Sequence, residues 1–155
     1  MLAPALRIGY VVGPRSIVKN VAAQRIYIDV QGDRVLEFAL AELIEEGEVQ
    51  RHVRRMRREY RARRDVLVEE LDSRLGSALS FNVPAGGIGL WVRADESLDI
   101  DAWSERARGR GALMITARHF SVDGRPRPFA RLGFASLNPD ELKEGVRRLA
   151  QSLEL

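Results

Sequence analysis

The chain has 155 residues, of which 45% are apolar, a formal net charge of +3 and a sequence pI of about 9.8. This length fits one domain or parts of two, and the apolar share is too high for a disordered chain. Because there is no cysteine, the sequence excludes disulfides, thiolate metal sites and a cysteine nucleophile. No apolar run approaches the roughly 20 residues that span a bilayer, and no signal-peptide pattern is present, so we expect a cytoplasmic protein.

The first 47 residues predict one strand and two helices. Residues 6–12, LRIGYVV, have the composition of a buried strand. Ser16 can cap a helix that ends near Ile28, and residues 34–46 predict a second helix, which Gly47 ends. One strand is too few for a sheet, so we interpret this segment as the remnant of a larger domain.

The longest predicted helix runs from about Glu48 to Leu75. Apolar residues recur in it at helical spacing and predict one buried stripe: Val49, Val53, Met56, Tyr60, Leu67 and Leu71. At about 1.5 Å per residue the helix would be roughly 40 Å long. Because that exceeds the usual length of a globular helix, we expect it to connect two bodies.

The remaining residues alternate between strands and helices. Residues 79–84, 88–94, 112–116 and 129–135 predict strands, and helices are expected from Asp99 to about Arg108 and from about Pro139 onward. The order ββαββα predicts a compact α/β sandwich in which helices pack on a small mixed sheet.

Two segments carry features of phosphate binding. The arginine-rich segment 51–64 either binds phosphate or forms a solvated helix face, and acidic partners at helical spacing favour the solvated face: Glu59, Asp65, Glu69 and Glu70. The glycines of residues 84–89, PAGGIG, lead into a strand, whereas a phosphate cradle leads into a helix. We therefore predict a tight connection between two strands.

The histidines do not predict a metal centre. His52 lies in the basic helix and His119 in a predicted loop, and neither has ligand-type spacing to the other or to carboxylates. No nucleophile elbow accompanies them.

Two arginines stand in predicted apolar strands and need partners. Arg7 lies between Leu6 and Ile8, and Arg131 lies between Ala130 and Leu132. Burial of an unpaired guanidinium is costly, so each needs an anion. An internal carboxylate and a ligand anion remain equal alternatives for Arg131, and a phosphate is the candidate for Arg7.

Three stretches together resemble a known family along nearly the whole chain: LAPALRIGYVVGP (2–14), QGDRVLEFALAELIEEGEVQRHVRRMRREYRARRDVLVEEL (31–71) and FARLGFASLNPDELKEGVRRLA (129–150). They resemble the C-terminal half of the aminotransferase-like domain of MocR-type regulators. This GntR subfamily is related to class I aminotransferases of pyridoxal 5′-phosphate (PLP) fold type I. The segment RHVRRMRREYRARRD is more particular to MocR proteins, whereas the first and third stretches are shared with aminotransferases.

The resemblance implies a domain organisation and two binding residues. Residues 1–47 would be a remnant of the large PLP-binding domain, 48–76 the interdomain helix and 77–155 the small C-terminal domain. Arg7 matches the family's arginine for the PLP phosphate. Arg131 matches the arginine that binds the α-carboxylate of an amino-acid substrate or effector.

The sequence also departs from the family pattern. The lysine that holds PLP covalently would stand just before Met1, and neither Lys19 nor Lys143 matches it. We therefore assign no catalytic residue and expect no transamination by this chain alone. By the same resemblance, the family's winged-helix domain, through which a parent regulator would contact DNA, would also stand before Met1, and the family's P-G-x-x-F loop corresponds to the divergent residues 116–120.

Three functions follow as hypotheses. The first is a truncated aminotransferase-like domain of a MocR-type regulator, which binds PLP and an amino acid in a homodimeric parent. The second is the C-terminal half of a working aminotransferase that a separate N-terminal half completes. The third is a small nucleic-acid-binding protein that uses residues 51–64.

Overall fold

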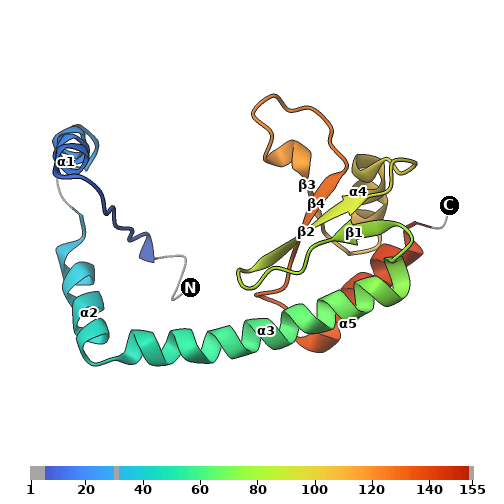
Figure 1. Cartoon of the computed structure of the whole chain (residues 1–155), viewed down its shortest axis with the longest axis horizontal. Coiled ribbons are helices and arrows are strands. Elements are labelled where there is room, and N and C mark those ends of the chain that lie inside the picture. The colour runs from blue at the N-terminus through green and yellow to red at the C-terminus, as the bar shows by residue number, and fades with distance from the viewer. Residues whose placement is uncertain (1–5, 30–31, 154–155) are drawn as a thin grey trace. The chain divides into compact units, whose positions relative to one another are not determined.

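The computed structural model describes residues 6–29 and 32–153, which fall into two compact units, 1–56 and 57–155 (Figure 1). Helix α3, Glu48–Leu75, begins in the first unit and continues into the second. Its bounds agree with the sequence prediction.

Two further helices form most of the unit 1–56. Helix α1 spans Arg15–Asp29 and α2 spans Arg34–Glu45, close to the predicted ranges, but α1 includes Ser16, so the prediction that Ser16 caps it is wrong. The carboxylate of Asp33 caps α2 by accepting the backbone N–H of Leu36 at 3.0 Å. Gly47 follows α2 with a φ of +75°, a conformation that favours glycine, and so allows the chain to turn into α3.

The prediction of a strand at residues 6–12 is wrong. The backbone from Arg7 to Pro14 is irregular and exposed, and residues 2–5 of the family motif lie outside the described residues. A strand needs a partner for its backbone hydrogen bonds, but all four strands in the described part of the chain belong to 57–155 and pair with one another. Composition alone therefore could not produce a strand here.

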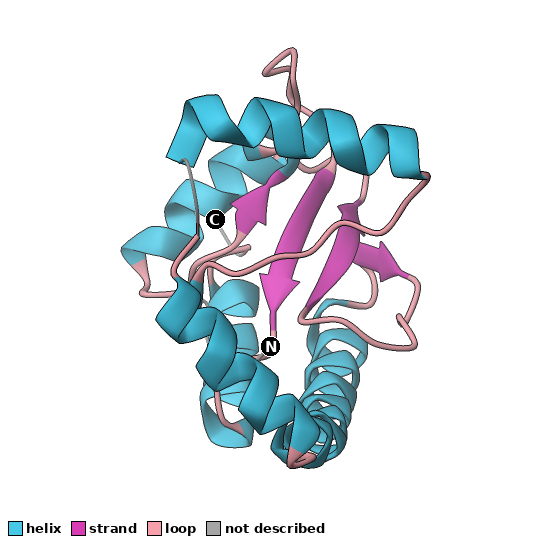
Figure 2. Cartoon of the chain, turned by 90° about the vertical axis from the view of Figure 1, so that its left-hand side faces the viewer, coloured by secondary structure: helices cyan, strands magenta, loops and turns pink. Residues whose placement is uncertain are grey.

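The unit 57–155 is built on one four-stranded sheet, whose strands can be followed in Figure 2. In chain order the strands are β1 Leu79–Phe81, β2 Gly89–Ala94, β3 Ile115–Thr116 and β4 Phe129–Gly133. Their spatial order is β1-β2-β4-β3 and every pairing is antiparallel, so the predicted mixed sheet is wrong. Strands β2 and β3 run in the same direction, but β4 separates them and runs opposite to both.

Strand β3 is shorter than the predicted 112–116 because the backbone before it closes the preceding helix. The N–H of Ala112 donates to the carbonyl of Ala107 at 2.9 Å, and the carbonyl of Met114 accepts the hydroxyl of Ser104 at 3.1 Å. These groups are committed to helix α4, Ile100–Gly109, and only Ile115 and Thr116 pair with β4.

The core lies between one face of the sheet and three helices. Leu90 and Val92 of β2 point to this face and are fully buried, as is Trp103 of α4. Helix α5, Pro139–Gln151, contributes Leu142, Val146 and Leu149. The indole N–H of Trp103 donates to Ser152 Oγ at 2.8 Å, which satisfies the buried polar group. Alternation along each strand leaves the opposite sheet face without a helical cover in this unit.

The predicted stripe of α3 is buried only in its C-terminal part. Leu67, Leu71 and Leu75 are buried, whereas Val53 is 43% exposed. The sheet and α5 cover the helix only where they share the core with it, which explains the difference.

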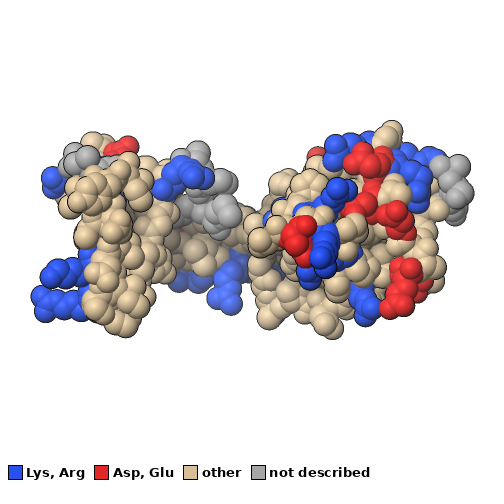
Figure 3. Space-filling view, turned by 90° about the horizontal axis from the view of Figure 1, so that it is seen from above, with Lys and Arg blue, Asp and Glu red and all other residues tan. Residues whose placement is uncertain are grey.

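The described part of the unit 1–56 contains no buried residue. It exposes large apolar side chains, among them Tyr10, Val12, Tyr27, Ile28, Val35 and Phe38. Figure 3 shows that most side chains on the visible face of this unit are uncharged. This unit therefore lacks a core of its own. No helix of the described chain has the length and apolar composition that a membrane span requires.

Truncation of the core should destabilise the protein much more than the same change at the surface. Leu71 is 0% exposed and Leu113 is 68% exposed. We expect Leu71→Ala to lower the free energy of unfolding by about 2–5 kcal/mol, because it removes transfer energy and leaves a cavity. The matched Leu113→Ala should change it by less than about 0.5 kcal/mol. Urea unfolding monitored by circular dichroism measures both, and equal effects would contradict the assigned core.

Candidate functional site

Arg131 lies on the sheet face that no helix of its unit covers. It is the central residue of β4 and pairs with Trp91 of β2 on one side and Ile115 of β3 on the other. Its side chain is half-buried, whereas its neighbours Ala130 and Leu132 point into the core. The alternation of β4 thus brings a guanidinium to the open face of an otherwise apolar strand.

Gly89 and Phe120 lie against the Arg131 side chain, and Trp91 supports Phe120. A Cβ at Gly89 would lie 3.4 Å from Arg131 Cγ and 3.5 Å from Cδ, so the glycine leaves room for the arginine stem to lie against β2. The guanidinium carbon stands 5.2 Å from the ring centre of Phe120, a cation–π distance. Phe120 in turn contacts Trp91 edge-on, with ring centroids 5.2 Å apart.

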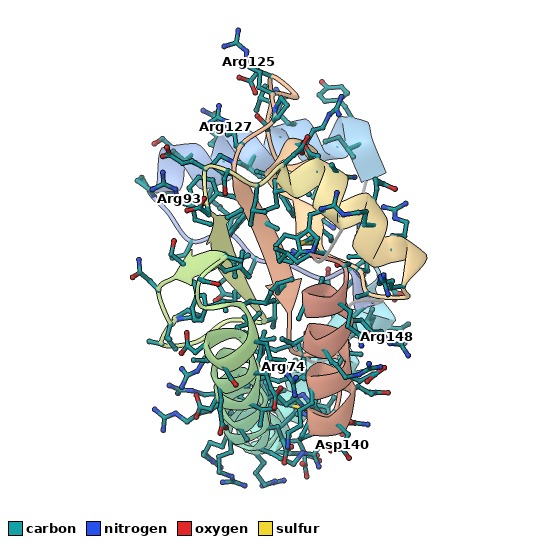
Figure 4. The ribbon with its side chains drawn as sticks, turned by 90° about the vertical axis from the view of Figure 1, so that its right-hand side faces the viewer. Arg74, Arg93, Arg125, Arg127, Asp140 and Arg148 are labelled. Carbon is teal, nitrogen blue, oxygen red and sulfur yellow. The ribbon has the colours of Figure 1, made fainter. Side chains whose placement is uncertain are left out.

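Arg131 also borders a cavity of about 580 Å³ that is lined mainly by residues of α5 and of the core face, among them Glu141 and Glu144. Both glutamates form hydrogen bonds with groups other than Arg131. Glu141 accepts the backbone N–H of Asn138 at 2.7 Å and so completes the capping box of α5. The labels of Asp140 and Arg148 mark the position of this helix in Figure 4.

Glu144 is held by two arginines of its own helix. Arg147 donates to it through two nitrogens at 2.7 and 2.6 Å, and Arg148 Nε donates at 2.7 Å. These hydrogen bonds, with that of Arg147 the strongest cause, lower the pKa of Glu144 from 4.5 to about 2. The carboxylate is therefore ionised and already paired.

Within residues 6–29 and 32–153, Arg131 forms no ion pair and no hydrogen bond through its side chain; its contact is the ring of Phe120. The alternative of an internal carboxylate partner thus has no support among the described residues. A guanidinium fork that is oriented but unpaired suits a planar carboxylate, which can accept two parallel hydrogen bonds. Trp91 and Phe120, 48% and 47% exposed, offer apolar surface beside it.

Arg7 belongs to the unit 1–56 and is exposed. Its φ is +51°, the left-handed conformation that non-glycine residues seldom adopt. Its guanidinium forms no ion pair or hydrogen bond within the described chain, and nothing lies within 4 Å of a Cβ built at Gly9 or Gly13. Arg7 and Arg131 belong to different units.

The remaining residues singled out from the sequence lie apart from Arg131. Lys19 is exposed on α1 and Lys143 is exposed on α5. His52 lies on α3 and His119 in the short helix η2, Ala117–His119. In the described ranges, no three side chains of the metal-binding types gather to form a metal site.

Sequence reasoning missed the side chains that orient Arg131. In the sequence, Phe120 stands out only as part of a divergent loop, and Gly89 only as part of a connection between two strands. The period-two alternation of β2 places Gly89 and Trp91 on one face and could have indicated that pair. The partner strand and the position of Phe120 require the fold.

Residues 1–149 match the family described as aminotransferase class I and II. The chain belongs to this family. Its relatives include HTH-type transcriptional regulators: TauR of Rhodobacter capsulatus is 31% identical over 98% of this chain and 31% of TauR. The probable rhizopine catabolism regulatory protein MocR of Rhizobium meliloti is 29% identical over 96% of this chain and 30% of that protein.

Solved structures of aminotransferases share the fold. The kynurenine aminotransferase of Pyrococcus horikoshii, in complex with PMP, KYN and KYA, superposes with a TM-score of 0.91 and 25% identity. The superposition covers 99% of this chain and 38% of the enzyme. The chain is thus part of a PLP fold type I structure and spans about a third of the length of its relatives.

The lowered pKa of Glu144 predicts a pH-dependent contribution to stability. A carboxyl group whose pKa is lower in the folded state stabilises the fold above its unfolded pKa, here 4.5, and this contribution is lost as the pH falls toward about 2. Glu144→Gln should therefore be less stable than the parent at neutral pH. The difference should shrink as the pH falls through this range.

Urea unfolding of both proteins over this pH range measures the difference directly. Glu105→Gln is the matched control, because Glu105 faces Arg108 at 3.8 Å and is 71% exposed. A difference for Glu144→Gln that does not change with pH would contradict the assigned ion pairs.

Proposed function

We propose that this chain supplies the ligand-binding arginines of an amino-acid-sensing, aminotransferase-like domain in a MocR-type regulator. Arg131 binds the carboxylate of the amino acid and Arg7 binds the phosphate of PLP. The observation that carries the proposal is the oriented Arg131 guanidinium, which has no internal carboxylate partner among the described residues. The regulators among the relatives support a sensing role.

The residues present fit PLP at its phosphate. Arg7 is exposed, forms no side-chain hydrogen bond in the described chain and stands two residues before the small residue Gly9. A guanidinium fork matches a phosphate group in geometry and charge. When bound, PLP supplies an electron sink beside the amino acid.

This chain's own residues bind and orient rather than hold the cofactor covalently. Lys19 and Lys143 are both exposed on helices and neither lines the cavity of Arg131. Arg131 would fix the carboxylate, while Trp91 and Phe120 exclude water from one side of it. We therefore assign no catalytic residue to the chain.

The second candidate is one half of a working aminotransferase. The close superposition on the kynurenine aminotransferase favours it. In either case we propose that further protein, either the remainder of the domain or a second copy in a homodimer, covers the exposed apolar side chains of 1–56. Transamination that appears only when a separate N-terminal part is added would establish the enzyme half and exclude a purely sensory role.

Replacement of Arg131 should weaken the binding of amino acids. Arg131→Lys keeps the charge but loses the planar fork, so we expect affinity to fall by about tenfold or more. Titration of the chain with a panel of L-amino acids, each compared with its amide, isolates the contribution of the carboxylate. Trp91 fluorescence reports binding, because its exposed ring lies beside the site, whereas Trp103 is fully buried.

The matched control is Arg93→Lys. Arg93 belongs to the neighbouring strand β2 but pairs with Glu96 at 3.1 Å. This variant should change affinity by less than about twofold, because an exposed pair contributes little. Equal binding of amino acids and their amides, or an unchanged affinity in Arg131→Lys, would exclude the proposed carboxylate site.

A further inference from the structure

The structure brings together the two segments whose phosphate-binding features were weak when each was considered alone. Part of the arginine-rich segment of α3 and the glycine-rich connection between β1 and β2 line the same cleft, of about 300 Å³. Its lining residues are Arg57, Arg58, Tyr60, Arg61, Arg64, Ala85, Gly86, Gly87 and Phe134. All of them belong to the unit 57–155.

Two arginines of α3 fix the walls of this cleft. Arg64 Nη1 donates to the carbonyl of Pro84 at 2.7 Å, which ties the helix to the start of the glycine-rich connection. Arg63 donates to the carbonyl of Ala135, just after β4. Arg64 therefore ties the arginine wall to the start of the glycine wall, whereas Arg63 ties the helix to the chain after β4, and both side chains are half-buried.

The other three arginines of the cleft carry uncompensated charge. Arg64 shares its charge with Asp65, at 2.6 Å, but Arg57, Arg58 and Arg61 have no ion pair among the described residues. Arg57 and Arg61 are four residues apart and so lie on one face of the helix. Their repulsion at close spacing favours an anion between them.

The glycine wall gives an anion access to the backbone. Nothing lies within 4 Å of a Cβ built at Gly86 or Gly87, and Gly87 has a φ of +101°. The N–H groups of residues 85–87 donate to no backbone acceptor in the part of the chain described here. Backbone donors on a glycine turn, opposite several guanidinium groups, form a typical anion-binding concavity.

We propose that this cleft binds a phosphate group, either as inorganic phosphate or as part of a small phosphate ester. Its volume is at the lower end of small-ligand sites, which favours a compact, dense anion. Tyr60 and Phe134 form its apolar border. The site is separate from Arg131 and does not depend on the function proposed above.

A titration with inorganic phosphate, followed by calorimetry on the full chain, tests the site. Arg57→Gln/Arg61→Gln removes two charges from the cleft, and Arg54→Gln/Arg55→Gln removes two from the same helix outside it. We expect the cleft variant to lose phosphate affinity by about tenfold or more, since charged hydrogen bonds are lost. The control variant should lose less than about twofold.

Two further arms make the test specific. Gly86→Ala adds a methyl group to a lining residue of the cleft at a position free of steric conflict, and we expect it to weaken phosphate binding as well. Arg131→Lys should leave phosphate binding unchanged, which separates this site from the carboxylate site. A simple phosphate monoester, glycerol phosphate, shows whether the ester binds more tightly than the free ion. Thermal unfolding confirms that each variant is folded.

Two results would overturn the proposal. Equal loss of affinity in the cleft and control variants would mean that phosphate responds only to the net charge of the helix. If a duplex oligonucleotide binds, and both double variants weaken it equally while phosphate does not compete, the helix is a general polyanion surface and the cleft is not a site.

Discussion

The interpretation of this protein depends on one charge: the guanidinium of Arg131, held on an open sheet face without a counter-ion from the described chain. Phe120 and the gap at Gly89 orient it, while Glu141 and Glu144 are committed to the cap and the arginines of α5. A fork that is held in place and has no internal partner is available for the carboxylate of a ligand. The sheet, the loop and α5 together maintain this arrangement.

The two units differ in what stabilises them. The unit 57–155 has a continuous core in which α3, α4 and α5 cover one face of the sheet around Trp103. The described part of 1–56 has helices but no core, and its apolar side chains remain exposed. Such surfaces are typical of segments that pack against further protein. Arg7 belongs to this exposed unit without a core, so its role in binding the PLP phosphate stays a proposal.

Most helices could be predicted from the sequence because caps and breakers mark them locally. Gly47 and Pro139 marked helix ends to within one or two residues, and the structure adds the caps by Asp33 and Asn138. The strand predicted at residues 6–12 does not form, because a strand depends on a partner that composition does not reveal. The predicted mixed sheet is wrong for a related reason. Strand β4 lies between β2 and β3, and this strand order depends on packing across the whole fold.

The candidate site, too, was predictable only in part from the sequence. The resemblance to MocR-type regulators singled out Arg7 and Arg131, but only the fold shows that Phe120 and Gly89 orient the second arginine and that Glu144 is already paired. Taken separately, neither the arginine-rich segment 51–64 nor the glycine-rich residues 84–89 predicts a phosphate site. The hydrogen bond from Arg64 to Pro84 joins them into one cleft, a long-range contact that neither segment indicates alone.

A crystal structure of the chain with a bound amino acid would test the central claim most directly. Our account predicts that both carboxylate oxygens lie within about 2.7–2.9 Å of Arg131 nitrogens, the usual distance of such charged hydrogen bonds. It also predicts that Glu144 remains bound to Arg147 and Arg148. A structure in which Arg131 turns to Glu141, Glu144 or another carboxylate of this chain, with the amino acid elsewhere, would contradict it.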